Sequence, residues 1–230
     1  MIVNVYKGKT KDVSVRDDGT AQFYFKDTVT GDATGAQDPG GNLVVGEKEG
    51  IAISALKLSN YFFNLFKEHN IPTHFISADI ENRTMDVYAA EKFGKGLEFV
   101  VRYIATGSFI RRFGDFCKEE TEFPDGVFEI TLKDDDRDDP VITKEILNTL
   151  NIATTEQVDA CTKIAGQVGK VLQEDLAKKE ITLYDFKIEC GIVNGKIVLI
   201  DEMSAGNMRC YKNGKKLDYI DATNLILETK

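Results

Sequence analysis

The sequence lacks the features that mark a zinc-binding, secreted or membrane-spanning protein. Its 230 residues include no tryptophan, and its four cysteines, at positions 117, 161, 190 and 210, form no CxxC pair. Scattered cysteines of this kind are typical of a reducing compartment. No apolar run approaches the length that spans a bilayer, and no basic segment followed by an apolar stretch opens the chain. We therefore expect a cytoplasmic protein without a signal peptide, a zinc site or a membrane partner.

The sequence also lacks a net positive charge. The 29 Lys and Arg residues are outnumbered by 38 Asp and Glu residues, which gives a net charge of −9. Proteins that bind nucleic acid need clustered Lys and Arg against the phosphate backbone, so we expect no nucleic-acid partner. A small basic pocket for a phosphorylated metabolite stays compatible with this charge. The two histidines, His69 and His74, are assigned no role, and no Ser–His or Cys–His constellation favours a hydrolase.

Hydrophobic periodicity predicts an α+β protein, with a β-rich lobe over residues 1–95 and a mixed lobe over residues 96–230. The predicted strands are residues 3–6, 22–25, 85–90, 98–104, 181–188 and 196–200. The predicted helices are residues 54–69, 142–150 and 155–178, with a short helix inside 105–113. Glycines recur throughout residues 27–50, which therefore are predicted to form a long loop, and long loops in compact domains are often functional.

A basic glycine turn lies near the N-terminus, in the segment Tyr6–Val13 with the sequence YKGKTKDV. Glycine lets backbone N–H groups approach an anion closely, and the neighbouring lysines add charge. The segment can therefore cover nucleotide phosphates, or it can be an ordinary solvated β-turn.

A second segment, VVRYIATGS, places Arg102 at the end of a strand and Ser108 in the following turn. Arginine binds phosphate through two parallel hydrogen bonds, and serine adds a donor. The same pattern also fits a surface arginine followed by a helix cap.

A third segment, LKDDDRDDP, holds five aspartates around Lys133 and Arg137. A solvated acidic loop is the usual explanation for such a run. Alternatively, Lys133 contacts a nucleotide and an aspartate such as Asp139 orients a substrate amine.

The fourth segment carries the most information, because strand alternation puts Asp185, Lys187 and Glu189 on one face of an otherwise apolar strand. Charges in such a position need partners. The turn at Asn194-Gly195 predicts a hairpin that brings Asp201 beside this strand. Two converging carboxylates make a hard-oxygen site for Mg²⁺, completed by phosphate oxygens and water, although an exposed polar sheet face would show the same pattern.

Taken in order, these segments resemble the SAICAR synthetase family (phosphoribosylaminoimidazole-succinocarboxamide synthase). The resemblance runs from Tyr6 to Arg209 and rests on the segments YKGKTKDV, KDTVTGD, a helix ending in HNIPT, VVRYIATGSFIRRFG, LKDDDRDDP, LYDFKIECG and IDEMSAGNMR. It implies a two-lobed fold with a protein-kinase-like ATP cleft. It also implies an ATP-dependent ligase of purine biosynthesis, which joins L-aspartate to carboxyaminoimidazole ribotide through an acyl phosphate.

The resemblance implies a role for individual residues as well. Gly8, Lys9, Lys11, Lys133 and Lys187 are expected to bind ATP, and Glu189 and Asp201 to hold Mg²⁺. The phosphate of the ribotide is expected to be bound by Arg102, Ser108 and Arg209. Lys187 and Asp185 are the expected catalytic residues, and Asp27, Thr28 and Asp139 are weaker candidates for the aspartate and imidazole subsites.

The chain departs from the family pattern before Arg209, where it has Ser-Ala-Gly-Asn-Met at 204–208 in place of a Ser-Pro-Asp run. Three alternatives therefore stay open: a paralogous ligase for a related heterocyclic carboxylate, a small-molecule kinase, and a catalytically silent nucleotide-binding module. Retained Lys187, Glu189 and Asp201 argue against the silent module. A homo-oligomer is compatible with the sequence.

Overall fold

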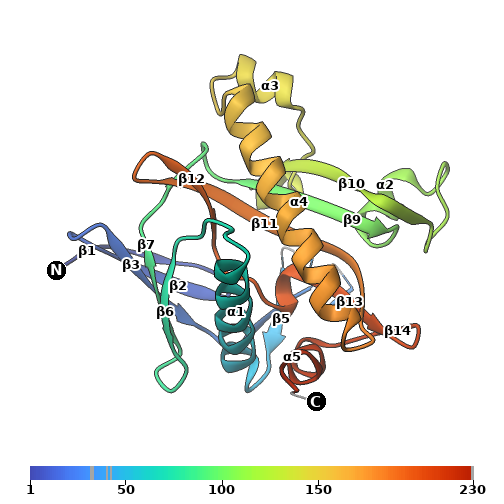
Figure 1. Cartoon of the computed structure of the whole chain (residues 1–230), viewed down its shortest axis with the longest axis horizontal. Helices are drawn as coiled ribbons and strands as arrows, with labels where there is room; N and C mark the ends of the chain where they lie inside the picture. Colours follow the sequence, from blue (N-terminus) through green and yellow to red (C-terminus); the bar gives the residue numbers. More distant parts are fainter. Residues whose placement is uncertain (32–33, 40, 42, 229–230) are drawn as a thin grey trace.

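The structure, a computed structural model, describes residues 1–31, 34–39, 41 and 43–228. It confirms the predicted α+β class and the two-lobed arrangement, with one sheet toward the N-terminus and a larger sheet built from strands between Glu91 and Lys216 (Figure 1). Among the described residues, no helix is both long and apolar enough to span a membrane.

The N-terminal sheet is antiparallel, with strand order β1-β2-β3-β7-β6. Its strands are β1 (Ile2–Lys7), β2 (Lys11–Arg16), β3 (Thr20–Phe25), β7 (Thr84–Tyr88) and β6 (Phe75–Asp79). Alternate residues of β3 and β7, including Phe23, Met85 and Val87, are buried. This alternation is the period-2 pattern of a sheet with one covered face.

The second sheet is also antiparallel, with order β10-β9-β11-β13-β14 and with β8 and β12 both paired to β11. Its strands are β8 (Glu91–Lys92), β9 (Leu97–Ile104), β10 (Glu122–Leu132), β11 (Thr182–Val193), β12 (Lys196–Ile200), β13 (Met208–Lys212) and β14 (Lys215–Lys216). Because β8 already joins this sheet, the chain passes from one sheet to the other between Tyr88 and Glu91. The predicted division near residue 95 stays a prediction.

Helices cover the two sheets, and α4 crosses β9 and β11 in Figure 1. The helices are α1 (Ile51–Glu68), α2 (Ser108–Phe113), α3 (Lys144–Thr149), α4 (Thr155–Ala177) and α5 (Tyr219–Leu227), with 3₁₀ turns at Asp135–Arg137 and Ala205–Asn207. Phe62, Phe63 and Phe66 bury one face of α1. The predicted cap of α4 is confirmed, because Thr154 and Gln157 form a reciprocal capping box.

Several predicted boundaries were wrong, each for a local reason. Residues 27–50 are not only loop: β4 (Thr28–Gly31) pairs with β5 (Leu43–Glu47), although Gly40 and residues 32–33 lie outside the described residues. Helix α1 begins at Ile51 rather than 54, and the Asp27 carboxylate accepts a hydrogen bond from the Ala52 N–H at 2.9 Å. This bond satisfies one of the open N–H groups of the first helical turn.

The elements absent from the sequence-based prediction include β2, β6, β10, β13 and α5. Strand β10 contains Pro124 and Gly126, and its pairing with β9 shifts register between Glu122 and Val127. Proline and glycine normally argue against a strand, but a bulge accommodates both.

A short segment, residues 72–74, connects the two sheets near the cleft. The Leu199 N–H donates to the Pro72 carbonyl at 2.9 Å, and the His74 N–H donates to the Leu199 carbonyl at 3.0 Å. The His74 carbonyl in turn accepts from the Tyr88 N–H of β7 at 2.8 Å. The end of β12 is therefore held against the N-terminal sheet at the point where the functional residues gather.

Candidate active site

A cavity of about 780 Å³ lies between the two sheets and has an apolar end and a charged end. Apolar side chains line it from both sides: Val13, Val15, Ala21 and Val87 from the N-terminal sheet, and Ile188 and Ile200 from the second sheet. An apolar slot of this kind suits a flat heterocyclic base, whereas the lysines and carboxylates at the other end suit phosphates and a cation.

The glycine turn between β1 and β2 closes the cavity on one side. The Gly8 N–H donates to the Lys11 carbonyl at 3.0 Å, and a Cβ at Gly8 would lie 2.6 Å from that oxygen. The turn therefore requires glycine. The Lys9 ammonium reaches Asp135 at 2.8 Å, and the Thr28 hydroxyl donates to the Lys9 carbonyl at 2.6 Å.

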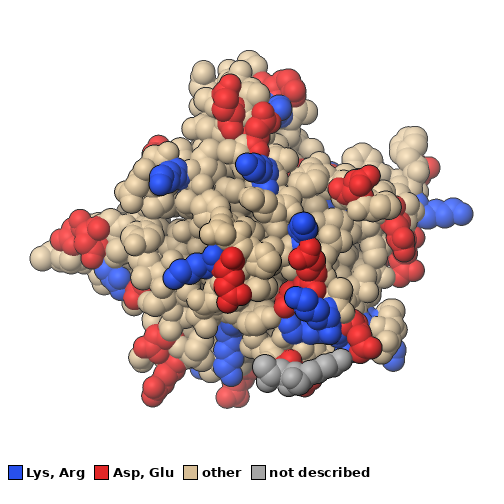
Figure 2. Space-filling model, viewed as in Figure 1, with Lys and Arg blue, Asp and Glu red and all other residues tan. Residues whose placement is uncertain are grey.

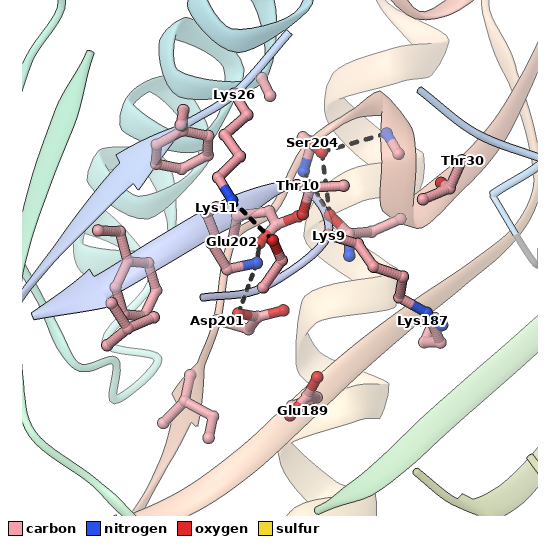
Figure 3. Close-up of a pocket in the computed structure, with 18 of the residues that line it drawn as sticks. Lys9, Thr10, Lys11, Lys26, Thr30, Lys187, Glu189, Asp201, Glu202 and Ser204 are labelled. Carbon is pink, nitrogen blue, oxygen red and sulfur yellow. Dashed lines mark hydrogen bonds and ion pairs between the residues drawn. The ribbon is translucent and has the colours of Figure 1, made fainter. Parts of the chain in front are cut away.

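Lysines and carboxylates alternate at the charged end of the cavity. Lys11 lies 2.9 Å from the Asp201 carboxylate and also pairs with Glu202, as Figure 3 shows. Lys133 pairs with Glu189. Burial disfavours the charge of Asp201, but Lys11 and Lys133 outweigh burial and hold the pKa of this carboxyl well below its usual range.

The two carboxylates predicted to bind a metal, Glu189 and Asp201, meet here because of strand register. Glu189 pairs with Ile200 across β11 and β12, and Asp201 follows Ile200 directly. Among the described residues, no group of three or more His, Cys, Asp or Glu side chains could hold a metal ion by itself. Mg²⁺ normally takes only one or two carboxylates together with water and substrate phosphates, so this donor set fits it.

A second cavity, of about 360 Å³, adjoins the first and is lined by Arg102, Ser108, Asp185 and Arg209. Asp185 lies opposite Arg102 of β9 and opposite Arg209 of β13, because β11 runs between those two strands. One Asp185 oxygen accepts from Arg102 at 2.9 Å and from Arg209 at 2.6 Å. Arg102 also donates to Ser108 at 3.0 Å.

Two further carboxylates bind the same two arginines. Glu129 accepts from the Arg102 Nε at 2.6 Å, and Asp38 accepts two bonds from the Arg209 Nη2 at 2.8 and 3.0 Å. Both arginines are buried, with 4% and 6% of their surface exposed. Buried guanidinium groups held in this way present their remaining donors in fixed directions, which suits recognition of a phosphate.

The two cavities share a wall that includes Glu98 and Lys187. The Lys187 ammonium lies 2.8 Å from Glu98, whose second oxygen accepts from the Thr131 hydroxyl at 3.0 Å. A group held in one cavity can therefore reach a group held in the other past the Lys187 side chain.

The structure places almost all of the predicted site residues in these two cavities. The first cavity is lined by Gly8, Lys9, Lys11, Thr28, Lys133, Lys187, Glu189 and Asp201, and the second by Arg102, Ser108, Asp139, Asp185, Lys187 and Arg209. Asp27 lines neither, because its carboxylate binds Arg83 at 2.7 Å and the first turn of α1. The role of each of these residues stays a prediction.

Sequence reasoning missed Glu98, Glu202, Asp38 and His74. Two had a readable signal: Glu98 shares the β9 face of Arg102 by alternation, and Glu202 is the neighbour of Asp201. Asp38 has no signal, because its contact with Arg209 spans 171 residues of sequence. His74 lies beside Asp201, and burial lowers its pKa to about 4.

Charged side chains of both signs are mixed on the face shown in Figure 2. On the described part of the face in Figure 2, Lys and Arg are interspersed with Asp and Glu, and no continuous basic patch appears.

Comparisons with known proteins agree on one family. A family model described as SAICAR synthetase matches residues 4–223. The chain is 45% identical to phosphoribosylaminoimidazole-succinocarboxamide synthase of Clostridium tetani, over 97% of this chain and 99% of that protein. It is 35% identical to the enzyme of the same name from Persephonella marina, over 93% and 86% of the two chains. A solved structure described as SAICAR synthetase (Type-2) in complex with ADP superposes with a TM-score of 0.82 at 32% identity, covering 94% of this chain and 88% of that one.

Proposed function

The chain belongs to the SAICAR synthetase family, and we propose that its two adjoining cavities divide the substrates of that reaction between them. The protein is an ATP-dependent carbon–nitrogen ligase of de novo purine biosynthesis. It joins L-aspartate to carboxyaminoimidazole ribotide and forms the succinocarboxamide, ADP and phosphate. The four cysteines are free, which suits the reducing cytoplasm that we propose as its location.

ATP occupies the first cavity, with adenine in the apolar slot and the phosphates at the lysines. The backbone of the Gly8 turn covers the phosphates, while Lys9, Lys11 and Lys133 neutralise them. The relative solved in complex with ADP supports nucleotide binding by this chain. Phosphoryl transfer depends mainly on such positioning and charge neutralisation, so the absence of a dedicated nucleophile from this set of residues is no obstacle.

Glu189 and Asp201 would hold Mg²⁺ together with the phosphates of ATP. When bound, the ion supplies positive charge to the phosphoryl group that is transferred. In the protein alone, Lys133 and Lys11 balance the two carboxylates, so each carboxylate already has a charged partner before nucleotide binds.

The ribotide lies in the second cavity, with its phosphate against Arg102, Arg209 and Ser108. Its carboxylate then points toward the shared wall, where Lys187 meets both cavities. One Asp185 oxygen holds both arginines in place, so Asp185 positions the phosphate site. It also stays a candidate for the catalytic role that the family resemblance implies.

Chemistry occurs at this wall. The ribotide carboxylate oxygen attacks the γ-phosphorus, the bond to ADP breaks, and an acyl phosphate forms. Lys187 stabilises the negative charge that develops between the two substrates. The aspartate amine then attacks the acyl carbon, phosphate leaves with the carboxylate oxygen, and the amine loses a proton. Thr28 and Asp139, one in each cavity, are placed to contact aspartate or the imidazole, whereas Asp27 would first have to release Arg83.

The observation that carries this proposal is the shared wall. A cavity suited to a nucleotide and a cavity suited to a phosphorylated sugar meet at a lysine, which is the arrangement that a carboxylate-activating ligase requires. A small-molecule kinase would need the same cleft but no amine substrate. The requirement for aspartate therefore separates the two functions.

An omission assay tests this point. With ATP, Mg²⁺ and ribotide alone, we expect slow ADP release, because the cleft protects the acyl phosphate from water. Addition of L-aspartate should raise the rate at least tenfold, with one amide formed per ADP. Full-rate ADP release without aspartate, with a stable phosphorylated product, would instead identify a kinase. A coupled spectrophotometric assay of ADP, with chromatography of the product, measures both.

A further inference from the structure

His74 is the one histidine in the described chain that lies inside the protein core beside the cleft. Only 2% of its surface is exposed. Its ring packs edge-on against Phe23, with centroids 5.6 Å apart, and near Phe63 at 6.0 Å. The residue is therefore fixed in orientation by an aromatic cage from β3 and α1.

The polar edge of this ring meets the backbone of Asp201. The His74 Nε2 lies 3.0 Å from the Asp201 carbonyl oxygen. A carbonyl oxygen only accepts hydrogen bonds, so Nε2 carries the proton and donates it. The imidazole thus reaches across from the N-terminal half of the chain to the residue that follows β12.

Asp201 needs such support because its backbone is in an unusual conformation. Its φ is +73°, in the left-handed region, which Asp enters more readily than most residues other than glycine but still at a steric cost. The strand before it is already fixed, because the Leu199 N–H donates to the Pro72 carbonyl and the Leu199 carbonyl accepts from the His74 N–H. The donated bond from His74 fixes the next carbonyl, and so it determines where the Asp201 side chain begins.

We propose that His74 is a positioning residue: by donating to the Asp201 carbonyl, it holds Asp201 in the left-handed conformation that directs its carboxylate into the cation site. This inference rests on the proposed role of Asp201 as a Mg²⁺ ligand. In the structure that carboxylate lies 2.9 Å from Lys11. Without the imidazole donor, the backbone can relax toward an ordinary φ and carry the carboxylate away from Lys11 and Glu189.

Nucleotide binding without turnover tests the proposal. ATP affinity is measured by calorimetry at a series of Mg²⁺ concentrations, with neither ribotide nor aspartate present. Mg²⁺ is expected to raise the affinity for ATP, and the Mg²⁺ concentration that gives half of this increase is the quantity compared. For His74→Leu we expect that concentration to rise about tenfold, because partners that orient a metal ligand contribute about 10- to 100-fold in metal affinity. His74→Gln, whose amide keeps an N–H donor at similar reach, should stay within about threefold of the parent protein. ATP affinity in the absence of Mg²⁺ should be the same in all three.

A second pair of variants separates positioning from simple packing. In an Asp201→Asn background, His74→Leu should add no further change in Mg²⁺ dependence, because its effect acts through the Asp201 carboxylate. If His74→Leu does not fold, His74→Met offers an unbranched apolar side chain that adapts to the same space. Thermal unfolding of each variant shows whether the fold is retained.

The outcomes distinguish the two ideas. If Asp201→Asn leaves the Mg²⁺ dependence unchanged, the proposed cation site is wrong. If Asp201→Asn changes it but folded His74→Leu or His74→Met does not, the cation site stands and the positioning role of His74 is wrong. An equal loss in the Leu and Gln variants, or a further loss in the Asp201→Asn background, would also overturn the positioning role.

Discussion

Replacement of Asp201 with Asn is expected to lower kcat by about 100-fold or more while leaving the fold intact. Asn matches Asp in size but lacks the charge that binds a cation and balances Lys11. Charge stabilisation by a bound ion contributes several kcal/mol to a transition state, and each 1.4 kcal/mol or so is about tenfold in rate. The fold should survive because Lys11 keeps its second partner, Glu202. The measurement is steady-state kinetics over a range of Mg²⁺ concentrations, with all three substrates saturating.

Asp86→Asn is the matched control for this change. Asp86 is paired with Arg16 on the N-terminal sheet, at 2.8 Å, and lines neither cavity. Partly exposed pairs of this kind contribute little stability, so the control should keep normal kinetics. Near-normal turnover of Asp201→Asn at low Mg²⁺ would show that the carboxylate does not bind the metal.

Arg102→Lys is expected to raise the KM for the ribotide about 10- to 100-fold and to change the KM for ATP less than about threefold. Arg102 donates to Glu129, Asp185 and Ser108 at once, and lysine cannot reproduce this planar fork. Loss of one or two charge-assisted hydrogen bonds costs about 1.5–3 kcal/mol each, and about 1.4 kcal/mol is tenfold in affinity. The KM of each substrate is measured with the other two saturating.

Lysine is the better substitution than alanine at this position because it keeps a positive charge between Asp185 and Glu129. Alanine would leave two buried carboxylates short of a partner, which is strongly destabilising and would obscure the effect on binding. Arg16→Lys, on the surface pair with Asp86, controls for the general effect of the exchange. Equal increases in KM for ribotide and ATP would contradict the separation of the two substrates into two cavities.

Local sequence patterns were enough to predict β11, β12 and the hairpin between them. Alternation in β11 placed Asp185, Lys187 and Glu189 on one face, and in the structure these residues line the two cavities. The turn at Asn194-Gly195 was also correct: both residues have positive φ values, of 50° and 76°. That geometry is the two-residue hairpin that this dipeptide favours. Short-range signals therefore predicted both strands and their connection.

The contacts that the sequence could not reveal join residues far apart in the chain. The partners of Arg209 include Asp38, which lies in a glycine-rich stretch with no periodic pattern. The contact between His74 and Asp201 depends on how the 72–74 segment lies along β12, and no local motif encodes that position. Strand β10 escaped prediction because its Pro124 and Gly126 mimic a loop, while a bulge keeps it in the sheet.

The central claim is that the ribotide carboxylate attacks ATP at the wall between the two cavities. Transfer of oxygen from the ribotide to phosphate tests this claim most directly. The ribotide is prepared with ¹⁸O in its carboxylate, and the reaction is run with ATP, Mg²⁺ and L-aspartate. We predict that each amide formed releases one phosphate carrying one ¹⁸O atom, with the second ¹⁸O retained in the amide, as mass spectrometry of both products would show. Amide formed together with unlabelled phosphate, with the lost ¹⁸O in water or in AMP instead, would contradict activation of the carboxylate by phosphoryl transfer from ATP.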